Sequence, residues 1–218
     1  MPILLFIHGF ATGPKIWQAQ IREFSKDFHV VTDIEHVEHG SDVYLVGWSM
    51  GGWKALELWQ EHHQKIKGLI LVSAFAKYVR SDDYPCGTPM VLLRKLEKRF
   101  MSDYKDGMHY FYDLVFKDKK IHRLIDQLPV PEKHDVDRWF EKLRQEDMRE
   151  LLPRINVPVL IIQGDQDPIV SPEAAEYLHG RIKDSELRVF AGVGHAPFLE
   201  KTREFNLTMR GFLAKNEN

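Results

Sequence analysis

Residues 44–56 read YLVGWSMGGWKAL and place one serine between an apolar run and an amphipathic one. Residues Gly47 to Gly51 fit G-x-S-x-G, a pattern in which the serine lies at a sharp turn from strand to helix. The backbone at such a turn is strained, so small neighbours are needed, and the free N–H groups of the following helix favour developing negative charge. The alternative is a glycine-rich turn that binds phosphate or nothing. The strand before Ser49 and the helix after it favour a nucleophile.

Short apolar runs recur along the chain, separated by segments with the hydrophobic period of a helix. This alternation is typical of a parallel sheet covered by helices. The expected strands are Ile3–Ile7, His29–Thr32, Val43–Val46, Leu69–Val72, Val159–Ile162 and Leu187–Phe190. The expected helices of this part are Ile16–Lys26, Gly51–Gln64, Pro172–Ile182 and about Arg203–Leu213. The predicted fold class is therefore α/β, with a mainly parallel sheet of about six strands flanked by helices.

The pattern changes between Lys77 and about Glu150, where strands give way to charged, aromatic-rich helical segments. Helices are expected there at Met90–Phe100, Tyr104–Phe116 and Asp135–Arg149. We interpret residues 77–150 as a helical lid, called the lid segment below. It is inserted into a single domain whose core is formed by residues 1–76 and 151–218.

The composition excludes several classes of function. A chain of 218 residues with 44% hydrophobic residues and a net charge of −2 has no general attraction to nucleic acid or to anionic lipid. Cys86 is the only cysteine, so neither an intrachain disulfide nor a thiolate zinc site can form. Neighbouring histidines such as His62 and His63 lack carboxylates at ligand spacing, and no metal is expected. No secretion signal or membrane span is recognised, so a cytoplasmic location is expected.

A serine hydroxyl is a poor nucleophile and needs a positioned base that is itself oriented by a third group. Asp167 follows the Val159–Ile162 strand, and His195 follows the Leu187–Phe190 strand. Both are loop residues at the carboxyl ends of strands, where open parallel sheets bind their ligands. Ser49, Asp167 and His195 are therefore the candidate catalytic residues, with Asp165 as the competitor for the acid.

Acyl transfer also needs hydrogen-bond donors for the oxyanion. The backbone N–H of Met50 is the natural first donor, and the loop after the first strand offers the N–H of Phe10 as the second. The side chains of Phe10, Trp48 and Met50 are expected to line an apolar acyl pocket. The alternative for each of them is ordinary core packing.

Four motifs occur in a fixed order: HGF at 8–10, GWSMGG at 47–52, GDQDPIV at 164–170 and GVGHAPF at 192–198. With them the chain resembles the α/β-hydrolase superfamily over nearly its whole length. Within that superfamily it looks most like the pimeloyl-acyl carrier protein methyl ester esterases of biotin synthesis, the BioH-type carboxylesterases. Trp17, YPCGTP at 84–89 and LPVPE at 128–132 contribute to this finer likeness.

The resemblance implies a mechanism and a substrate. Ser49 would attack the methyl ester of a medium-length acyl group, His195 would move the proton, and Asp167 would hold the imidazole. The family spacing favours Asp167 over Asp165, which is expected to organise the turn. No cofactor is implied. The alternatives are a general short-chain carboxylesterase or thioesterase, and a non-catalytic homologue that keeps the fold as a ligand pocket.

The resemblance also implies roles for the lid segment. Phe111 and Val115 would line the acyl channel, and basic residues would contact an acidic acyl carrier protein. The candidates for that contact are Arg94, Lys95, Lys98 and Arg99. The alternative for this basic run is a solvated helix face.

Two departures from the family are visible. The chain begins at the first core strand, without the usual N-terminal hairpin, so a sheet of six strands is expected. Between Asp33 and Asp42 there is too little sequence for the helix that normally joins those strands. An extended link would leave one flank of the sheet bare, and such a face could serve as a dimer contact.

Overall fold

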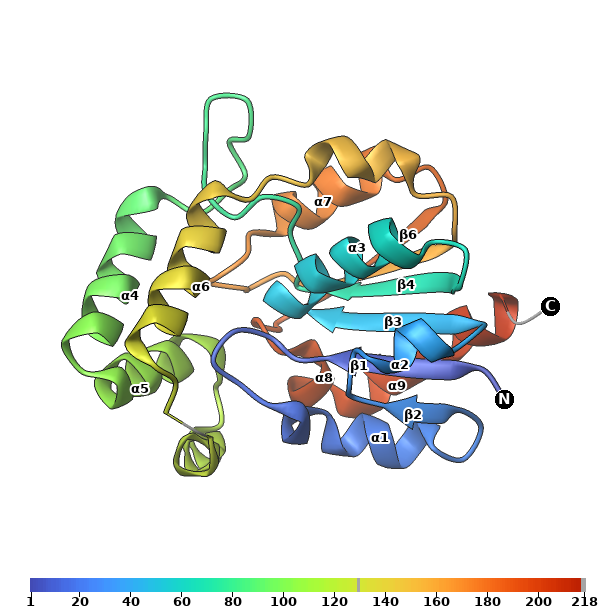
Figure 1. The fold of residues 1–218 in the computed structure, drawn as a ribbon, viewed down its shortest axis with the longest axis horizontal. Coiled ribbons are helices and arrows are strands. Elements are labelled where there is room, and N and C mark those ends of the chain that lie inside the picture. Colours follow the sequence, from blue (N-terminus) through green and yellow to red (C-terminus); the bar gives the residue numbers. More distant parts are fainter. Residues whose placement is uncertain (129, 217–218) are drawn as a thin grey trace.

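Six parallel strands form one sheet in the computed structural model, which describes residues 1–128 and 130–216. The strands are β1 (Ile3–Ile7), β2 (His29–Val31), β3 (Val43–Trp48), β4 (Ile66–Val72), β5 (Val159–Gly164) and β6 (Ser185–Phe190). Their order across the sheet is β2-β1-β3-β4-β5-β6, and every neighbouring pair is parallel (Figure 1). Both faces of β3 and β5 are buried, which explains why these strands read as uninterrupted apolar runs.

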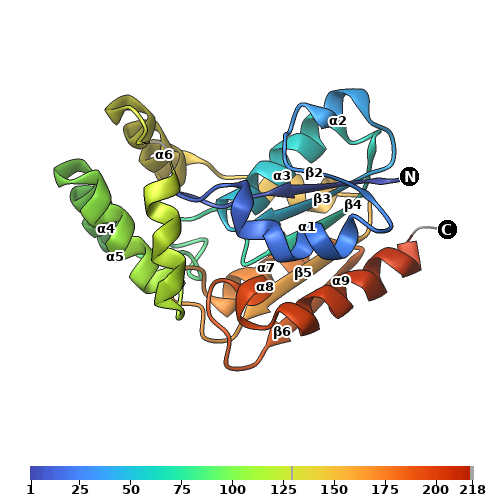
Figure 2. The ribbon, with the colours of Figure 1, turned by 90° about the horizontal axis from the view of Figure 1, so that it is seen from below.

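Helices cover both faces of this sheet, as Figures 1 and 2 show. Alternate side chains of β1 point to opposite faces of the sheet. Leu4 and Phe6 pack in one apolar cluster, while Leu5 and Ile7 pack in the other. The first face is covered by η1 (Pro14–Trp17), α1 (Gln18–Phe24), α8 (Pro197–Glu200) and α9 (Thr202–Asn216). The second is covered by α2 (His36–His39), α3 (Met50–His62), η3 (Arg149–Arg154) and α7 (Pro172–Arg181).

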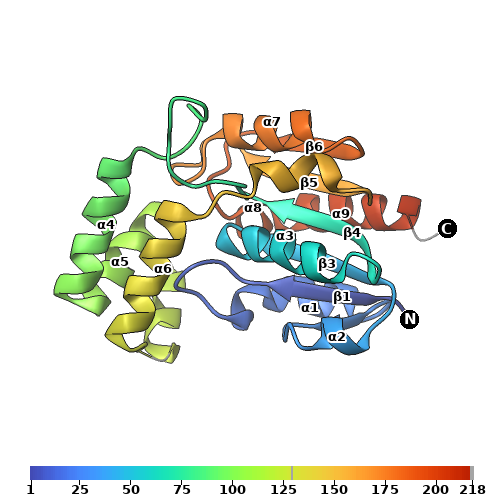
Figure 3. The same ribbon diagram turned by 45° about the horizontal axis from the view of Figure 1, so that its top comes forward.

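The remaining helices lie together beyond the carboxyl ends of the strands, as Figure 3 shows from another side. They are α4 (Met90–Ser102), α5 (Tyr104–Val115), η2 (Lys119–Gln127) and α6 (Lys133–Gln145). All of them belong to the lid segment, so this segment lies over the sheet edge at which ligands bind in parallel α/β folds. Its action as a lid stays a prediction.

The α/β fold and the six-stranded parallel sheet predicted from the sequence are confirmed. The link between β2 and β3 differs from expectation, because it is not extended and contains the single helical turn α2. Val37 of that turn is only 1% exposed and packs against the second face of the sheet. The expected bare flank is therefore wrong for the described residues.

Pro129 of the LPVPE motif and the last two residues, 217 and 218, lie outside the described residues. Within the described ranges, the helices all lack the length and apolar content that crossing a membrane requires.

Candidate active site

Ser49 occupies a strained turn between β3 and α3. Its φ of 55° and ψ of −122° lie in a region that residues other than glycine rarely adopt. A Cβ added to Gly47 would overlap the carbonyl oxygen of Gly51, and one added to Gly51 would overlap that of Ile7. The two glycines of the motif are thus required by close backbone packing. The amide of Ser49 donates to the carbonyl oxygen of Val72 at 2.8 Å, which holds the turn over the sheet edge.

Asp167 and His195 are brought together from the ends of β5 and β6. His195 Nδ1 lies 2.8 Å from Asp167 Oδ2, and both side chains are fully buried. A carboxylate can only accept, so this contact assigns the proton to Nδ1 and leaves Nε2 as an acceptor. Among the described residues, Nε2 of His195 has no hydrogen-bond partner. A buried acceptor without a partner is unfavourable, and a catalytic role is one of the reasons for which proteins retain such an atom.

Asp167 is held by two amides and one side chain. Oδ1 accepts from the amides of Ile169 at 2.8 Å and Val170 at 3.0 Å, and Oδ2 accepts from Nε2 of Gln163 at 2.9 Å. These donors fix the orientation of the carboxylate that contacts His195. Sequence reasoning missed Gln163, although a polar residue inside the apolar β5 run was a usable signal.

Asp165 has a different position from Asp167. Its Oδ1 accepts from the amides of Gly192 at 2.7 Å and Val193 at 3.3 Å, so it ties the end of β5 to the loop that carries His195. This is the turn-organising role expected for it. The same loop is held by Glu200, whose Oε1 accepts from the amide of Gly194 at 2.9 Å.

Lys117 connects the lid segment to the His195 loop. Its ammonium group donates to the carbonyl oxygen of Gly192 at 2.8 Å and forms an ion pair with Glu200 at 2.9 Å. Sequence reasoning also missed these contacts, because nothing in the local pattern around Lys117 indicates them.

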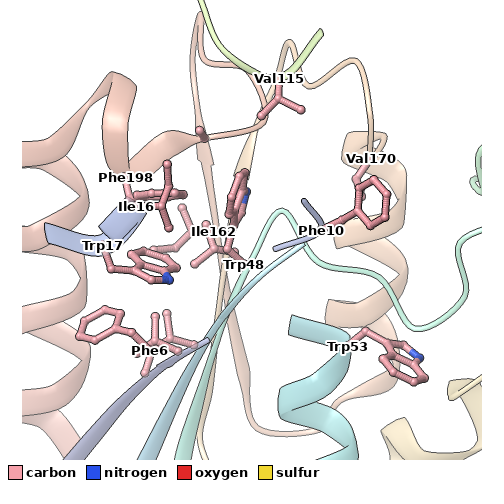
Figure 4. Packing of buried hydrophobic residues seen from close by; sticks show 14 of the residues in the cluster. Phe6, Phe10, Ile16, Trp17, Trp48, Trp53, Val115, Ile162, Val170 and Phe198 are labelled. Carbon is pink, nitrogen blue, oxygen red and sulfur yellow. The ribbon is translucent and has the colours of Figure 1, made fainter. Parts of the chain in front are cut away.

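Trp48 lies on the core side of the site. Its indole N–H donates to the main-chain carbonyl oxygen of His195 at 2.7 Å, and its ring centroid lies 5.4 Å from that of the imidazole. The ring packs against Phe198 (Figure 4). It also contacts Phe116 and is 1% exposed. The expectation that Trp48 lines an acyl pocket is therefore wrong for this structure. β3 alternates faces, and Trp48 shares with Val46 the face covered by α9.

The described residues include no hydrogen bond between Ser49 and His195. Ser49 is 5% exposed, and the tip of β3 that carries it contacts the His195 loop through Trp48. Hydrogen bonds of catalytic groups are often long before substrate binds, so this geometry leaves the pair available. Ser49 and His195 as a catalytic pair remain a prediction.

The two amides expected to bind an oxyanion belong to Phe10 and Met50. Neither amide donates a backbone hydrogen bond within the described parts of the chain. Met50 is the first residue of α3, where an amide has no partner inside the helix. Both N–H groups are thus available to an anionic oxygen.

The side chain of Phe10 joins the loop after β1 to the lid segment. Its ring makes edge contacts with four aromatic rings at centroid distances of 5.3–5.5 Å: Phe100, Phe111, Trp139 and Phe140.

A cavity of about 650 Å³ lies beside this cluster and is lined by Phe10 and Met50. Phe111 and Val115 are 4% and 2% exposed and do not line it, because both pack into the core.

The basic residues expected to contact a carrier protein lie on α4. Arg94, Lys95 and Lys98 are exposed. Arg99 is half-buried instead: it forms an ion pair with Asp106 at 3.0 Å and lies over the ring of Tyr110. Three of the four candidates therefore share an accessible surface.

Comparison with known proteins assigns this geometry to a family. The family described as serine aminopeptidase, S33 (Hydrolase_4) matches residues 8–202. This match spans most of the chain. The chain belongs to this α/β-hydrolase family.

Similar members of the α/β-hydrolases include a pimeloyl-[acyl-carrier protein] methyl ester esterase from Neisseria meningitidis serogroup B (strain H44/76). It is 34% identical over 177 residues, which are 78% of this chain and 68% of that protein. The biotin biosynthesis bifunctional protein BioHC of Cellvibrio japonicus is 27% identical over 221 residues, covering 89% of this chain and 44% of that protein.

Among solved α/β-hydrolase structures, an esterase from Exiguobacterium antarcticum superposes with a TM-score of 0.90. It is 21% identical, and the alignment covers 98% of this chain and 92% of that one. This likeness shows the fold. With the family and the curated relatives, the chain is placed among the carboxylic ester hydrolases.

Proposed function

We propose that this chain is a serine esterase that hydrolyses the methyl ester of a medium-length acyl group, such as a pimeloyl group linked to acyl carrier protein in biotin synthesis. The observation that carries the proposal is the buried imidazole of His195, held by Asp167 and with Nε2 unpaired, beside the strained Ser49 turn. The names of the curated relatives supply the substrate class.

In the first half of the reaction, Ser49 Oγ attacks the ester carbonyl carbon while His195 Nε2 takes the hydroxyl proton. The carbonyl oxygen becomes an oxyanion, which accepts hydrogen bonds from the amides of Phe10 and Met50. The carbon–oxygen bond to the methoxy group then breaks. His195 returns the proton to that oxygen, so methanol leaves and an acyl group stays on Ser49.

In the second half, water attacks the acyl-enzyme and His195 takes one of its protons. The bond to Ser49 Oγ breaks, the proton returns to the serine, and the carboxylic acid is released. Asp167 stabilises the positively charged imidazole in both halves through its bond to Nδ1.

The exposed face of α4 suits a carrier protein. Arg94, Lys95 and Lys98 lie there with two exposed apolar side chains, Val91 at 69% and Leu92 at 51% exposure. A basic rim around apolar contacts is complementary to an acidic protein surface.

The test compares a carrier-linked pimeloyl methyl ester with p-nitrophenyl butyrate, using wild type and Ser49→Ala. Wild type should hydrolyse both esters, and the variant should lose nearly all activity on both. Full activity of Ser49→Ala would exclude the serine mechanism, and ligand binding without hydrolysis by wild type would favour a non-catalytic homologue.

Carrier recognition is tested separately with Arg94→Glu combined with Lys98→Glu. The pair should raise KM for the carrier-linked ester and leave the small ester unaffected. The control is Arg203→Glu, an exposed residue of α9. If the KM for each ester were the same in the variants as in wild type, α4 would be excluded as the carrier contact.

A further inference from the structure

The cavity beside Phe10 is a groove between α3 and α6, called the α3–α6 groove below. Its walls are residues 7–14, the first two turns of α3 and the facing side of α6, together with Tyr104, Leu128 and Pro131. Figure 4 shows Phe10 and Trp53 on the α3 side of the sheet, away from Trp17 and Phe198. Phe111 and Val115, which the family resemblance assigns to the acyl channel, do not line it.

The link between β2 and β3 does not line this groove. Its single helical turn, α2, lies over the amino ends of the strands, where Gly40 packs against the side chains of Ile3 and Val43. The groove lies at the opposite, carboxyl end of β1, as the positions of α2 and α6 in Figure 1 show.

The inner end of the groove adjoins the proposed reaction centre. Gly9, which lines it, packs so closely on the nucleophile turn that an added Cβ would lie 3.3 Å from Cβ of Ser49. Phe10 and Met50 also line it, and their amides are the proposed oxyanion donors. A ligand in the groove would extend directly from a carbonyl group held by those amides.

The walls of the groove are mostly apolar, and its rim is positively charged. Trp53 and Trp139 form part of the apolar wall. Lys54, Arg138 and Lys142 lie at the rim with one acid, Glu57. His8 also faces the groove, but burial lowers the pKa of its imidazole and keeps it neutral near pH 7.

The three cations differ in whether a carboxylate of the protein already pairs with them. Lys54 lies 2.9 Å and Lys142 3.7 Å from the carboxylate of Glu57, and Lys142 also lies over the ring of Trp53. Arg138 is exposed and has no ion-pair partner within the described ranges. Its planar guanidinium can bind a carboxylate or a phosphate through two hydrogen bonds.

We propose that the α3–α6 groove binds the non-reacting end of the ester substrate, a flexible apolar chain that ends in an anionic oxygen group bound by Arg138. The inference rests on the proposed function. It adds the path of the apolar substrate chain and names Arg138 as the residue that recognises the charged end of that chain. The anion can be a free carboxylate or the phosphate of a carrier-derived linker, since both present the same oxygen chemistry.

The experiment measures kcat/KM for three methyl esters of matched chain length: a neutral one, one with a free carboxylate at the far end, and one with a phosphate linker but no carrier protein. The preference is the ratio of kcat/KM for an anionic ester to kcat/KM for the neutral one. Arg138→Glu should lower this ratio about five-fold or more, and the decrease should be smaller at high salt. The anionic ester whose ratio decreases more shows whether Arg138 binds a free carboxylate or the phosphate of a linker. Lys133→Glu, an exposed change on the same helix but outside the groove, should keep the wild-type preference.

An unchanged preference in Arg138→Glu would overturn the groove assignment while leaving the esterase intact. If wild type hydrolyses none of the esters, the proposed function fails, and calorimetric binding of the same three probes to Ser49→Ala decides the groove separately. Weaker binding of the anionic probes after Arg138→Glu would support it, and equal binding would exclude it.

Discussion

The indole N–H of Trp48 lies 2.7 Å from the main-chain oxygen of His195, so the residue before the proposed nucleophile holds the loop of the proposed base. This bond joins the tip of β3 to the loop after β6 across two intervening strands. We therefore expect Trp48 to act as a positioning residue that couples the two halves of the site.

Replacing this indole should change the rate of reaction more than substrate binding. Trp48→Phe keeps an aromatic ring but leaves the buried oxygen of His195 without its donor, at a cost of about 1–3 kcal/mol in stability. We expect kcat to fall while KM changes little, measured on p-nitrophenyl butyrate. The control is Trp17→Phe, because the Trp17 N–H is buried and has no partner among the described residues. Equal kcat values for the two variants would contradict the positioning role.

Gln163 should affect catalysis through Asp167. Gln163→Leu removes the donor to Asp167 Oδ2 and to the carbonyl oxygen of Val170. Gln20→Leu is a matched control, since Gln20 is equally buried but bonds to Phe198 and Asn206.

Both glutamine variants should lose about 1–3 kcal/mol of stability in urea unfolding. Only Gln163→Leu should lower kcat, because only Gln163 touches the acid that orients His195. A similar fall in kcat for Gln20→Leu would show that general destabilisation is the cause.

Local patterns were sufficient to predict the sheet and the Ser49 turn. The strands are apolar runs bounded by turn residues, and Gly47 and Gly51 flank the serine within one short motif. Asp167 and His195 were predicted to meet because parallel strands end at one edge.

Other features depend on which distant residues become neighbours. Phe111 faces Phe10 instead of the cavity because α4, α5 and α6 close around that ring. Arg138 and Lys54 share a groove only because α6 lies beside α3. For Trp48 the sequence left a pocket wall and core packing open, and the alternation of β3 favours core packing on the α9 face.

Glycine substitutions should separate the required backbone contacts from ordinary helix propensity. Gly51→Ala would push a methyl group into the carbonyl oxygens of Ile7 and His8, and should cost at least about 2–3 kcal/mol. Gly211→Ala in α9 meets no atom within 4 Å and should stabilise the fold by about 0.4–1 kcal/mol. Thermal unfolding measures both. A stable Gly51→Ala would contradict the close packing of α3 on β1.

His8 should make the fold less stable as the pH falls. Burial lowers the pKa of its imidazole below the ordinary value of 6.5, although the bond from Nδ1 to the oxygen of Gly9 opposes this shift. Between the two pKa values the unfolded chain binds the proton and the folded chain does not, so stability is complete above about pH 6.5 and is lost below it. The midpoint of thermal unfolding should therefore drop from pH 7.5 to pH 5.5 more in wild type than in His8→Gln. Parallel curves for wild type and His8→Gln would show that His8 does not contribute.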